Sequence, residues 1–215
     1  MRAVEKLLAS KRLLAHVSRD FAPIALFQSF SVEDMVLTDL IYDDLVHQEY
    51  ANITMFTIDT GRLPEESHRL MDQLRQRYGD VLKVYYPDAA QLEAVDNQYR
   101  FRDDYQQRSY EVRLLNPLKR ALGNFNAWLS GSDALQESTN AGALISWDSS
   151  HQIPRFNPLS RWSEDEIRSY LKHRGLPVHR HILAASDGYN YQPNAGLWWW
   201  QSTPERAWET SRNIA

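Results

Sequence analysis

The chain has 215 residues, of which 43% are hydrophobic and 24% are charged, so it is long enough to bury a core and ordinary in composition. Its 24 basic and 28 acidic residues give a formal net charge of −4, which argues against a nucleic-acid binder, and no apolar stretch reaches the about 20 residues of a membrane helix. The absence of cysteine excludes a disulfide, a thiolate nucleophile and a cysteine-bound zinc ion or iron–sulfur cluster.

The first half of the chain alternates between helical and strand-like segments. Residues 3–18 place apolar side chains every three or four positions without a cleavage motif, which predicts an amphipathic helix and a cytoplasmic protein. Three short apolar runs predict strands: Ile24–Phe27, Ile53–Ile58 and Val81–Tyr86. Helical patterns separate them, one from Val32 onward and one at Glu65–Tyr78. Strands separated by helices need crossover connections, so the order predicts a parallel sheet flanked by helices.

The second half is less regular. Residues 96–108 are polar and aromatic and fit either an ordered loop or a covering helix, and Ala127–Ser130 predicts a fourth strand after a helix that begins near Pro117. Ser163 and Glu166 form a capping-box pattern before a helix that Gly175 ends. Residues 187–215 form a loop-rich tail, and since no repeat or linker is evident we expect a single domain over residues 1–215.

Ligands of parallel α/β sheets bind beyond the carboxyl ends of the strands. Three predicted loops lie there, at residues 28–34, 59–62 and 131–140. Ser29 and Ser31 precede a helix and either cap it, which is the commoner use, or help its N-terminus to hold an anion. Asp59 either bonds to nearby backbone amides or meets a ribose or base edge, and the pattern leaves both open.

Several strings, in order from about residue 26 to residue 200, resemble the sulfonucleotide reductases, which reduce adenylylsulfate or phosphoadenylylsulfate. The strings are Ser29–Asp34, Phe56–Glu66, Arg113 with Asn116–Leu122, Ala127–Gly131, Phe156–Ser163, Asp187–Tyr189 and Trp198–Trp200. The resemblance implies an adenine nucleotide alpha-hydrolase-like fold of Rossmann type. It also implies a nucleotide site, whose residues in this chain would be Ser29, Phe30, Ser31, Asp34, Asp59, Thr60, Gly61, Arg62, Gly131 and Gln136.

The chain departs from that family where the family's chemistry occurs. The family attacks the sulfate sulfur with a cysteine near its C-terminus, and this chain has Ala207–Ser211 there. Ser109–Tyr110 and Asn190–Asn194 stand where many members have the cysteine pairs of an iron–sulfur cluster. The loop at 131–140 keeps Gln136 but lacks the family's arginines. A serine hydroxyl is barely ionised at neutral pH, so we expect no catalytic residue. Since the cysteine ligands are missing and no complete set of metal ligands is evident, we expect no cluster and no metal.

These departures lead to three hypotheses. The leading one is a nucleotide-binding regulatory or partner subunit of sulfate assimilation, which binds an adenine nucleotide or sulfonucleotide weakly and pairs with another protein or with itself. The second is an enzyme of the same superfamily with different chemistry, such as a nucleotide pyrophosphatase or transferase. The third is a reductase that uses a thiol from a partner chain.

Two further clusters have ordinary interpretations. His179, His181 and Asp187 have no obvious fourth metal ligand, and we expect the histidines to be surface residues. Trp198–Trp200 either stack on an adenine or, as we favour, pack against the domain.

Overall fold

The computed structural model describes residues 3–43, 50–131 and 142–179. The strands of the described residues are β1 (Ile24–Phe27), β2 (Ile53–Ile58), β3 (Leu82–Tyr85), β4 (Ala127–Leu129), β5 (Ile145–Asp148) and β6 (Ile153–Phe156). The helices are α1 (Ala3–Asp20), α2 (Val32–Tyr42), α3 (Glu65–Tyr78), α4 (Ala89–Gln98), α5 (Tyr105–Tyr110), the π-helix η2 (Glu111–Leu115), α6 (Asn116–Leu122) and α7 (Glu164–Arg174).

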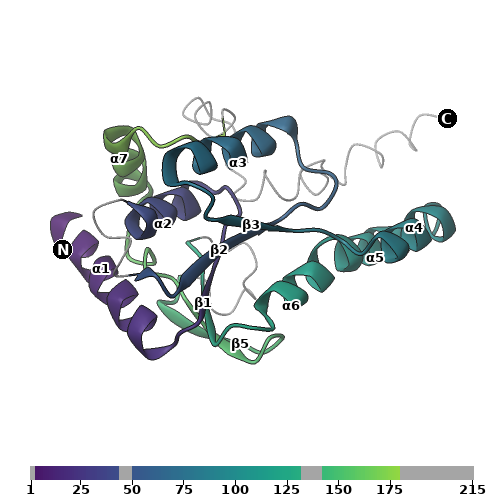
Figure 1. Cartoon of the computed structure of the whole chain (residues 1–215), viewed down its shortest axis with the longest axis horizontal. Helices are drawn as coiled ribbons and strands as arrows, with labels where there is room; N and C mark the ends of the chain where they lie inside the picture. Colours follow the sequence, from purple (N-terminus) through teal and green to yellow (C-terminus); the bar gives the residue numbers. More distant parts are fainter. Residues whose placement is uncertain (1–2, 44–49, 132–141, 180–215) are drawn as a thin grey trace, which may run out of the picture.

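The six strands form one sheet in the order β3-β2-β1-β4-β6-β5 (Figure 1). Strands β3, β2, β1, β4 and β6 pair in parallel, and only β5 at the edge is antiparallel to its neighbour. The chain therefore moves outward from β1 through β2 to β3, then returns to the other side of β1 to form β4. This reversal puts a topological switch point between β1 and β4, where sheets of this type bind ligands.

The central strand β1 is buried on both faces, as its unbroken apolar run predicts. Ile24 and Leu26 face one core, which α1, α2, α3 and α7 complete, while Ala25 and Phe27 face a second core completed by α6. Successive side chains of a strand point to opposite faces, so one strand anchors both layers of helices. The predicted fold class, a parallel sheet flanked by helices, is confirmed.

The predicted elements agree with the structure except at particular places. All four predicted strands are present, with β3 and β4 shorter by end residues, and the capping box of Ser163 and Glu166 begins α7. Residues 96–108, for which a loop or a helix was expected, contain the end of α4 and the start of α5. Strands β5 and β6 were not predicted: both are four residues long, Ser146 and Asp148 make β5 half polar, and Pro154 and Arg155 break the apolar pattern of β6.

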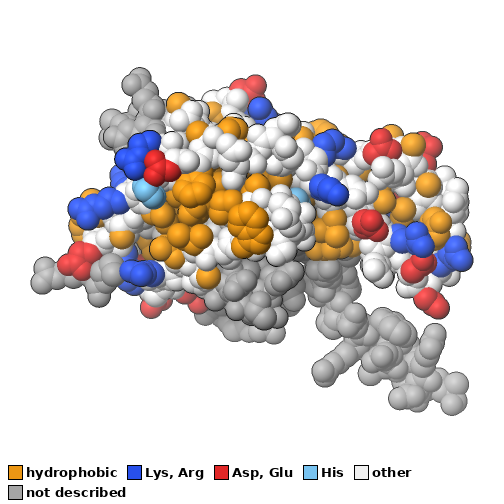
Figure 2. Space-filling model, turned by 90° about the horizontal axis from the view of Figure 1, so that it is seen from below, with side chains coloured by type: hydrophobic (Ala, Val, Ile, Leu, Met, Phe, Trp, Pro, Cys, Tyr) orange, Lys and Arg blue, Asp and Glu red, His pale blue; other side chains and the backbone are white. Residues whose placement is uncertain are grey.

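The outer strand β5 leaves large apolar side chains in contact with solvent. Ile145 and Trp147 are each 56% exposed. Figure 2 views the molecule from below, where β5 lies in Figure 1, and shows hydrophobic side chains gathered on this face. Among the described residues no helix is both long and apolar enough to cross a membrane.

Candidate functional site

Three loops meet at the carboxyl edge of the sheet, one after each of β1, β2 and β4. The strands are parallel neighbours, so the residues after them emerge at the same edge. The amide of Gln28, after β1, donates to the carbonyl of Phe56 in β2 at 2.8 Å. The amide of Gly131, after β4, donates to the Asp34 carboxylate at 2.6 Å. The predicted juxtaposition of the loops that follow β1 and β2 is confirmed, and residue 131 joins them.

The buried side chain of Gln28 shapes the turn after β1. Its Oε1 accepts a hydrogen bond from the amide of Phe30 at 2.7 Å, and its Nε2 donates to the hydroxyl of Thr38 at 2.6 Å. This arrangement holds Phe30 in a left-handed conformation with φ of 64°. A non-glycine residue with positive φ is strained, and such strain persists where the surroundings enforce it. Gln28 and Thr38 are therefore supporting residues of the loop that sequence reasoning missed.

The serines of this turn have different roles. Ser31 is the N-cap of α2, and its hydroxyl accepts from the amide of Asp34 at 3.1 Å. Ser29 does not cap the helix: its amide donates to Oδ2 of Asp34 at 3.0 Å, and its hydroxyl donates to the same oxygen. The expectation that both serines are caps is right for Ser31 and wrong for Ser29.

Asp34 joins the loop after β1 to the loop after β4. One of its oxygens accepts from Ser29 and the other from Gly131, and its side chain is fully buried. Burial raises the pKa of the Asp34 carboxyl, and the hydrogen bonds from Ser29 and Gly131 and the charge of Arg155 only partly oppose this. A buried carboxyl with a raised pKa at the edge where ligands bind is typical of a functional site.

Residue 131 has to be glycine for this arrangement. A Cβ there would lie 2.7 Å from the backbone carbonyl carbon of Glu33, so a side chain would push β4 away from the start of α2. The other residue predicted from this loop, Gln136, lies outside the described residues.

The loop after β2 is ordered by its own side chains. Oδ1 of Asp59 accepts from the amide of Gly61 at 2.8 Å, and the hydroxyl of Thr60 accepts from the amide of Arg62 at 3.3 Å. Gly61 has a φ of +72°, a conformation that a residue with a Cβ rarely adopts. The hydrogen bond that Asp59 accepts from Gly61 is one of the two roles that the sequence left open, the local one. Oδ2 of Asp59 takes no part in that bond.

The expectation that the histidines near the end of the chain are surface residues is wrong for His179. His179 is 2% exposed rather than a surface residue: its Nε2 lies 3.3 Å from the hydroxyl of Ser67 and its Nδ1 lies 3.3 Å from Glu66, both on α3. His181, Asp187 and Trp198–Trp200 lie outside the described residues. Within the described ranges no group of three or more His, Asp or Glu side chains is arranged to hold a metal ion.

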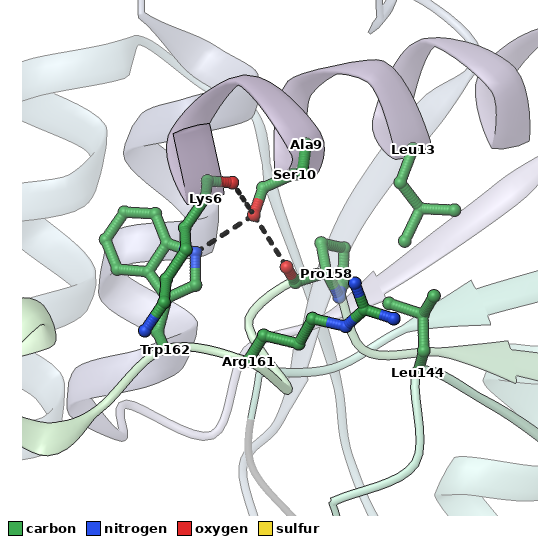
Figure 3. Close-up of a pocket in the computed structure, with 8 residues that line it drawn as sticks. All are labelled: Lys6, Ala9, Ser10, Leu13, Leu144, Pro158, Arg161 and Trp162. Carbon is green, nitrogen blue, oxygen red and sulfur yellow. Dashed lines mark hydrogen bonds between the residues drawn. The ribbon is translucent and has the colours of Figure 1, made fainter. Parts of the chain in front are cut away.

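One small cavity lies beside contacts that hold α1 in place. A space of about 70 Å³ lies between α1 and the segment joining β6 to α7, and the Ser10 hydroxyl beside it donates to the carbonyl of Pro158 at 2.7 Å and accepts from Nε1 of Trp162 at 3.0 Å (Figure 3). This space is too small for a nucleotide.

A larger cavity, of about 750 Å³, opens on the α6 side of the sheet. Trp128 and Arg155, neighbours on β4 and β6, form part of its wall, and the guanidinium carbon of Arg155 lies 5.0 Å from the ring centre of Trp128. Ligand pockets of proteins are typically ~300–1,000 Å³, so this cavity has the size of one.

The parallel sheet, the switch point and the two loops that Asp34 joins there define the class of protein: an α/β nucleotide-binding fold of the adenine nucleotide alpha-hydrolase type. The family follows from the sequence. The chain belongs to the phosphoadenosine phosphosulfate reductase domain family, which it matches over residues 23–183.

Individual relatives agree with this assignment. An adenosine 5'-phosphosulfate reductase from Allochromatium vinosum is 32% identical over 216 residues, covering 90% of this chain and 80% of the relative. An adenosine 5'-phosphosulfate reductase from Burkholderia cepacia is 29% identical, covering 88% of this chain and 81% of the relative.

Solved structures share the fold at lower sequence identity. A phosphoadenylyl-sulfate reductase from Candida auris superposes with a TM-score of 0.68 and 19% identity, covering 85% of this chain and 86% of that one. A U34-tRNA thiolase from Methanococcus maripaludis gives a TM-score of 0.57 and 14% identity, covering 83% of this chain and 66% of that one.

Proposed function

We propose that the protein binds an adenine nucleotide or sulfonucleotide at the carboxyl edge of its sheet and acts as a regulatory or partner subunit of sulfate assimilation. The proposal rests on the hydrogen bonds that Asp34 accepts from Ser29 and from Gly131, which connect two loops at the switch point of the sheet. The N-terminus of α2 lies at the same edge, where its positive dipole end and its amides favour an anionic group. Related proteins are named as reductases of adenosine 5'-phosphosulfate, and the Candida auris structure is a phosphate complex.

The chain lacks the groups for an autonomous reduction. Without cysteine it has no thiolate to attack the sulfate sulfur and no partner for thiol–disulfide exchange. The nearest chemical substitute, a serine, is a poor nucleophile unless a base activates it. The protein therefore binds substrate-like molecules without converting them on its own.

The residues present do not fit the iron–sulfur cluster of many family members. Ser109, at the position of a cluster cysteine, is 3% exposed and its hydroxyl accepts a hydrogen bond from Nε of Arg113 at 3.1 Å. Its neighbour Tyr110 is part of the wall of the larger cavity. Neither side chain provides a thiolate, and no step of the proposed function involves a cluster.

The proposal is tested by calorimetric titration of the purified protein with AMP, ATP, adenylylsulfate and phosphoadenylylsulfate. We expect AMP to bind, and the Gly131→Ala variant to bind it more weakly because its Cβ forces β4 away from α2. Gly123→Ala is the matched control, since a Cβ at Gly123 meets only ordinary contacts at 3.5 Å or more. The substitutions Asp133→Arg and Ala134→Arg should strengthen the binding of the sulfonucleotides more than that of AMP. Each charged hydrogen bond to the added oxyanion contributes ~1.5–3 kcal/mol.

A parallel assay measures sulfite release with thioredoxin present. We expect none, and sulfite from the protein alone would contradict the proposal. Sulfite that appears only when a second, thiol-bearing protein is added would favour the borrowed-thiol hypothesis, and hydrolysis of ATP would favour different chemistry. No binding of any adenine nucleotide at millimolar concentration would overturn nucleotide recognition itself.

A further inference from the structure

A buried arginine outside the predicted site lies directly behind the loop after β2. Arg113 belongs to η2 and is 3% exposed. Its guanidinium reaches three acceptors: Nε donates to the Ser109 hydroxyl at 3.1 Å, Nη1 to the carbonyl of Thr60 at 2.9 Å, and Nη2 to Oδ2 of Asp96 at 2.6 Å. A guanidinium is costly to bury unless its donors are satisfied, and the planar fork of Arg113 meets that requirement.

The backbone around Arg113 is unusual. The helical segment passes from α5 to α6 through the five-residue π-helix Glu111–Leu115. π-Helical turns are rare and occur mostly as single turns at functional sites. Arg113 lies within this wider turn and so presents its side chain to Thr60, far away in the sequence.

Asp96 connects Arg113 to the exposed end of the same loop. Its Oδ1 accepts from the hydroxyl of Tyr105 at 2.9 Å, and that hydroxyl accepts in turn from Arg62. Arg62 also lies 3.7 Å from Asp96. Burial would raise the pKa of Asp96, but the hydrogen bonds from Tyr105 and Arg113 lower it on balance, so Asp96 is ionised at neutral pH.

The loop is connected to the helical layer through Arg113 and Arg62. Among the described residues, the side chains of Asp59 and Thr60 bond to amides within the loop itself, at Gly61 and Arg62. A Cβ at Gly61 would lie 3.4 Å from Nη1 of Arg113, so the guanidinium packs directly against this glycine. The amide of Asp59 donates to the carbonyl of Tyr85 in β3 at 2.9 Å, so the sheet fixes the first residue of the loop. The bonds from Arg113 and Arg62 connect the rest of the loop to the helical layer.

We propose that Arg113, held by Asp96, is a positioning residue that keeps the Thr60–Gly61 backbone in the conformation that receives the nucleoside part of an adenine nucleotide. This inference rests on the proposed function for its ligand. Its structural half, that Arg113 orders the loop, stands on the contacts alone.

The experiment compares Arg113→Gln and Asp96→Asn with Arg108→Gln as the matched control. Arg108 lies on α5, and its exposed side chain pairs with Asp104 without a bond to the loop. Each protein is titrated with AMP, and amide hydrogen exchange is measured at Gly61 and, for the body of the sheet, at Met55 of β2. We expect Arg113→Gln to weaken AMP binding by about tenfold to a hundredfold, which corresponds to one charged hydrogen bond.

Hydrogen exchange separates positioning from general stability. We expect the Gly61 amide to exchange at least about tenfold faster in Arg113→Gln while Met55, deep in the sheet, stays protected. Equal acceleration at both amides would show that Arg113 only stabilises the fold and would overturn the inference. If the wild type binds AMP and Arg113→Gln binds it with the same affinity, the inference is also overturned. If the wild type binds no AMP, the proposed function fails, and unchanged exchange at Gly61 would separately refute the ordering role of Arg113.

Discussion

Two buried carboxylates on the same helix behave in opposite ways. Asp34, in the first turn of α2, is surrounded by neutral donors: the amide and hydroxyl of Ser29 and the amide of Gly131. Asp39, one turn later, accepts from the hydroxyls of Tyr78 at 2.7 Å and Tyr170 at 2.9 Å and from Nε of Arg174 at 2.7 Å.

The two pKa values shift in opposite directions because the donors differ in charge. Burial raises the pKa of Asp34, and neutral donors do not overcome it. Burial would also raise the pKa of Asp39, but the hydrogen bonds from Arg174, Tyr78 and Tyr170 and the charge of Arg174 lower it on balance. Asp39 therefore fastens α3 and α7 to α2, whereas Asp34 organises the loops of the candidate site at a cost to its own ionisation.

The largest effect is expected from Asp39→Asn, which leaves two partly buried tyrosines and Arg174 around a neutral amide. Removing one partner of a fully buried ion pair costs about 3–5 kcal/mol, and since the Arg174 side chain is 33% exposed we expect a loss near the lower end of this range in the free energy of unfolding at pH 7, measured by urea denaturation. Because the folded pKa is lowered, the stabilisation by Asp39 is present above the unfolded pKa of about 3.9 and is lost as the pH falls through the folded value. The variant should lack this acid dependence.

The control for this prediction is Asp43→Asn. Asp43 meets the same Arg174 at 2.8 Å, but its side chain is 27% exposed, so its ion pair contributes about 1 kcal/mol or less. Equal losses in the two variants would mean that burial is not what makes Asp39 important.

A smaller effect of opposite pH dependence is expected from Asp34→Asn. The carboxyl group of Asp34 offers two oxygens to the donors of Ser29 and Gly131, whereas an asparagine side chain offers one. We therefore expect the variant to lose about 1–3 kcal/mol in the free energy of unfolding at pH 4. The raised folded pKa of Asp34 means that the wild type loses stability as the pH rises above about 3.9, because the folded state then holds the proton more tightly than the unfolded state. The difference in the free energy of unfolding between wild type and variant should become smaller from pH 4 to pH 7, measured by urea denaturation of both proteins. A gap that widens with pH would show that Asp34 is stabilised as an anion.

The smallest effect is expected from Arg77→Gln. Arg77 lies 3.4 Å from Asp39, and its side chain is 33% exposed, so the loss should be about 1 kcal/mol or less by thermal denaturation. Arg174→Gln should cost more, because Arg174 bonds to both Asp39 and Asp43. The reverse order would place the positive charge that controls Asp39 on α3 instead of α7.

Features that depend on neighbouring residues can be predicted from the amino-acid sequence. The apolar run of β1 predicts a strand buried on both faces, Ser163 and Glu166 begin α7, and the helices between the first three strands require a parallel order. Helix period, capping and strand burial are local properties, so they can be predicted without the fold. The order of the motifs along the chain is also enough to indicate the family.

Contacts between polar groups that are distant in the sequence depend on how the chain packs. The bond from Gly131 to Asp34 spans 97 positions and the bond from Arg113 to Thr60 spans 53, and no local pattern of charge or spacing marks either pair. His179 looked like a surface residue because the sequence does not show that the chain after α7 returns to α3, where it is buried against Ser67. A buried polar group must find a partner, but which partner it finds depends on how the helices and loops pack.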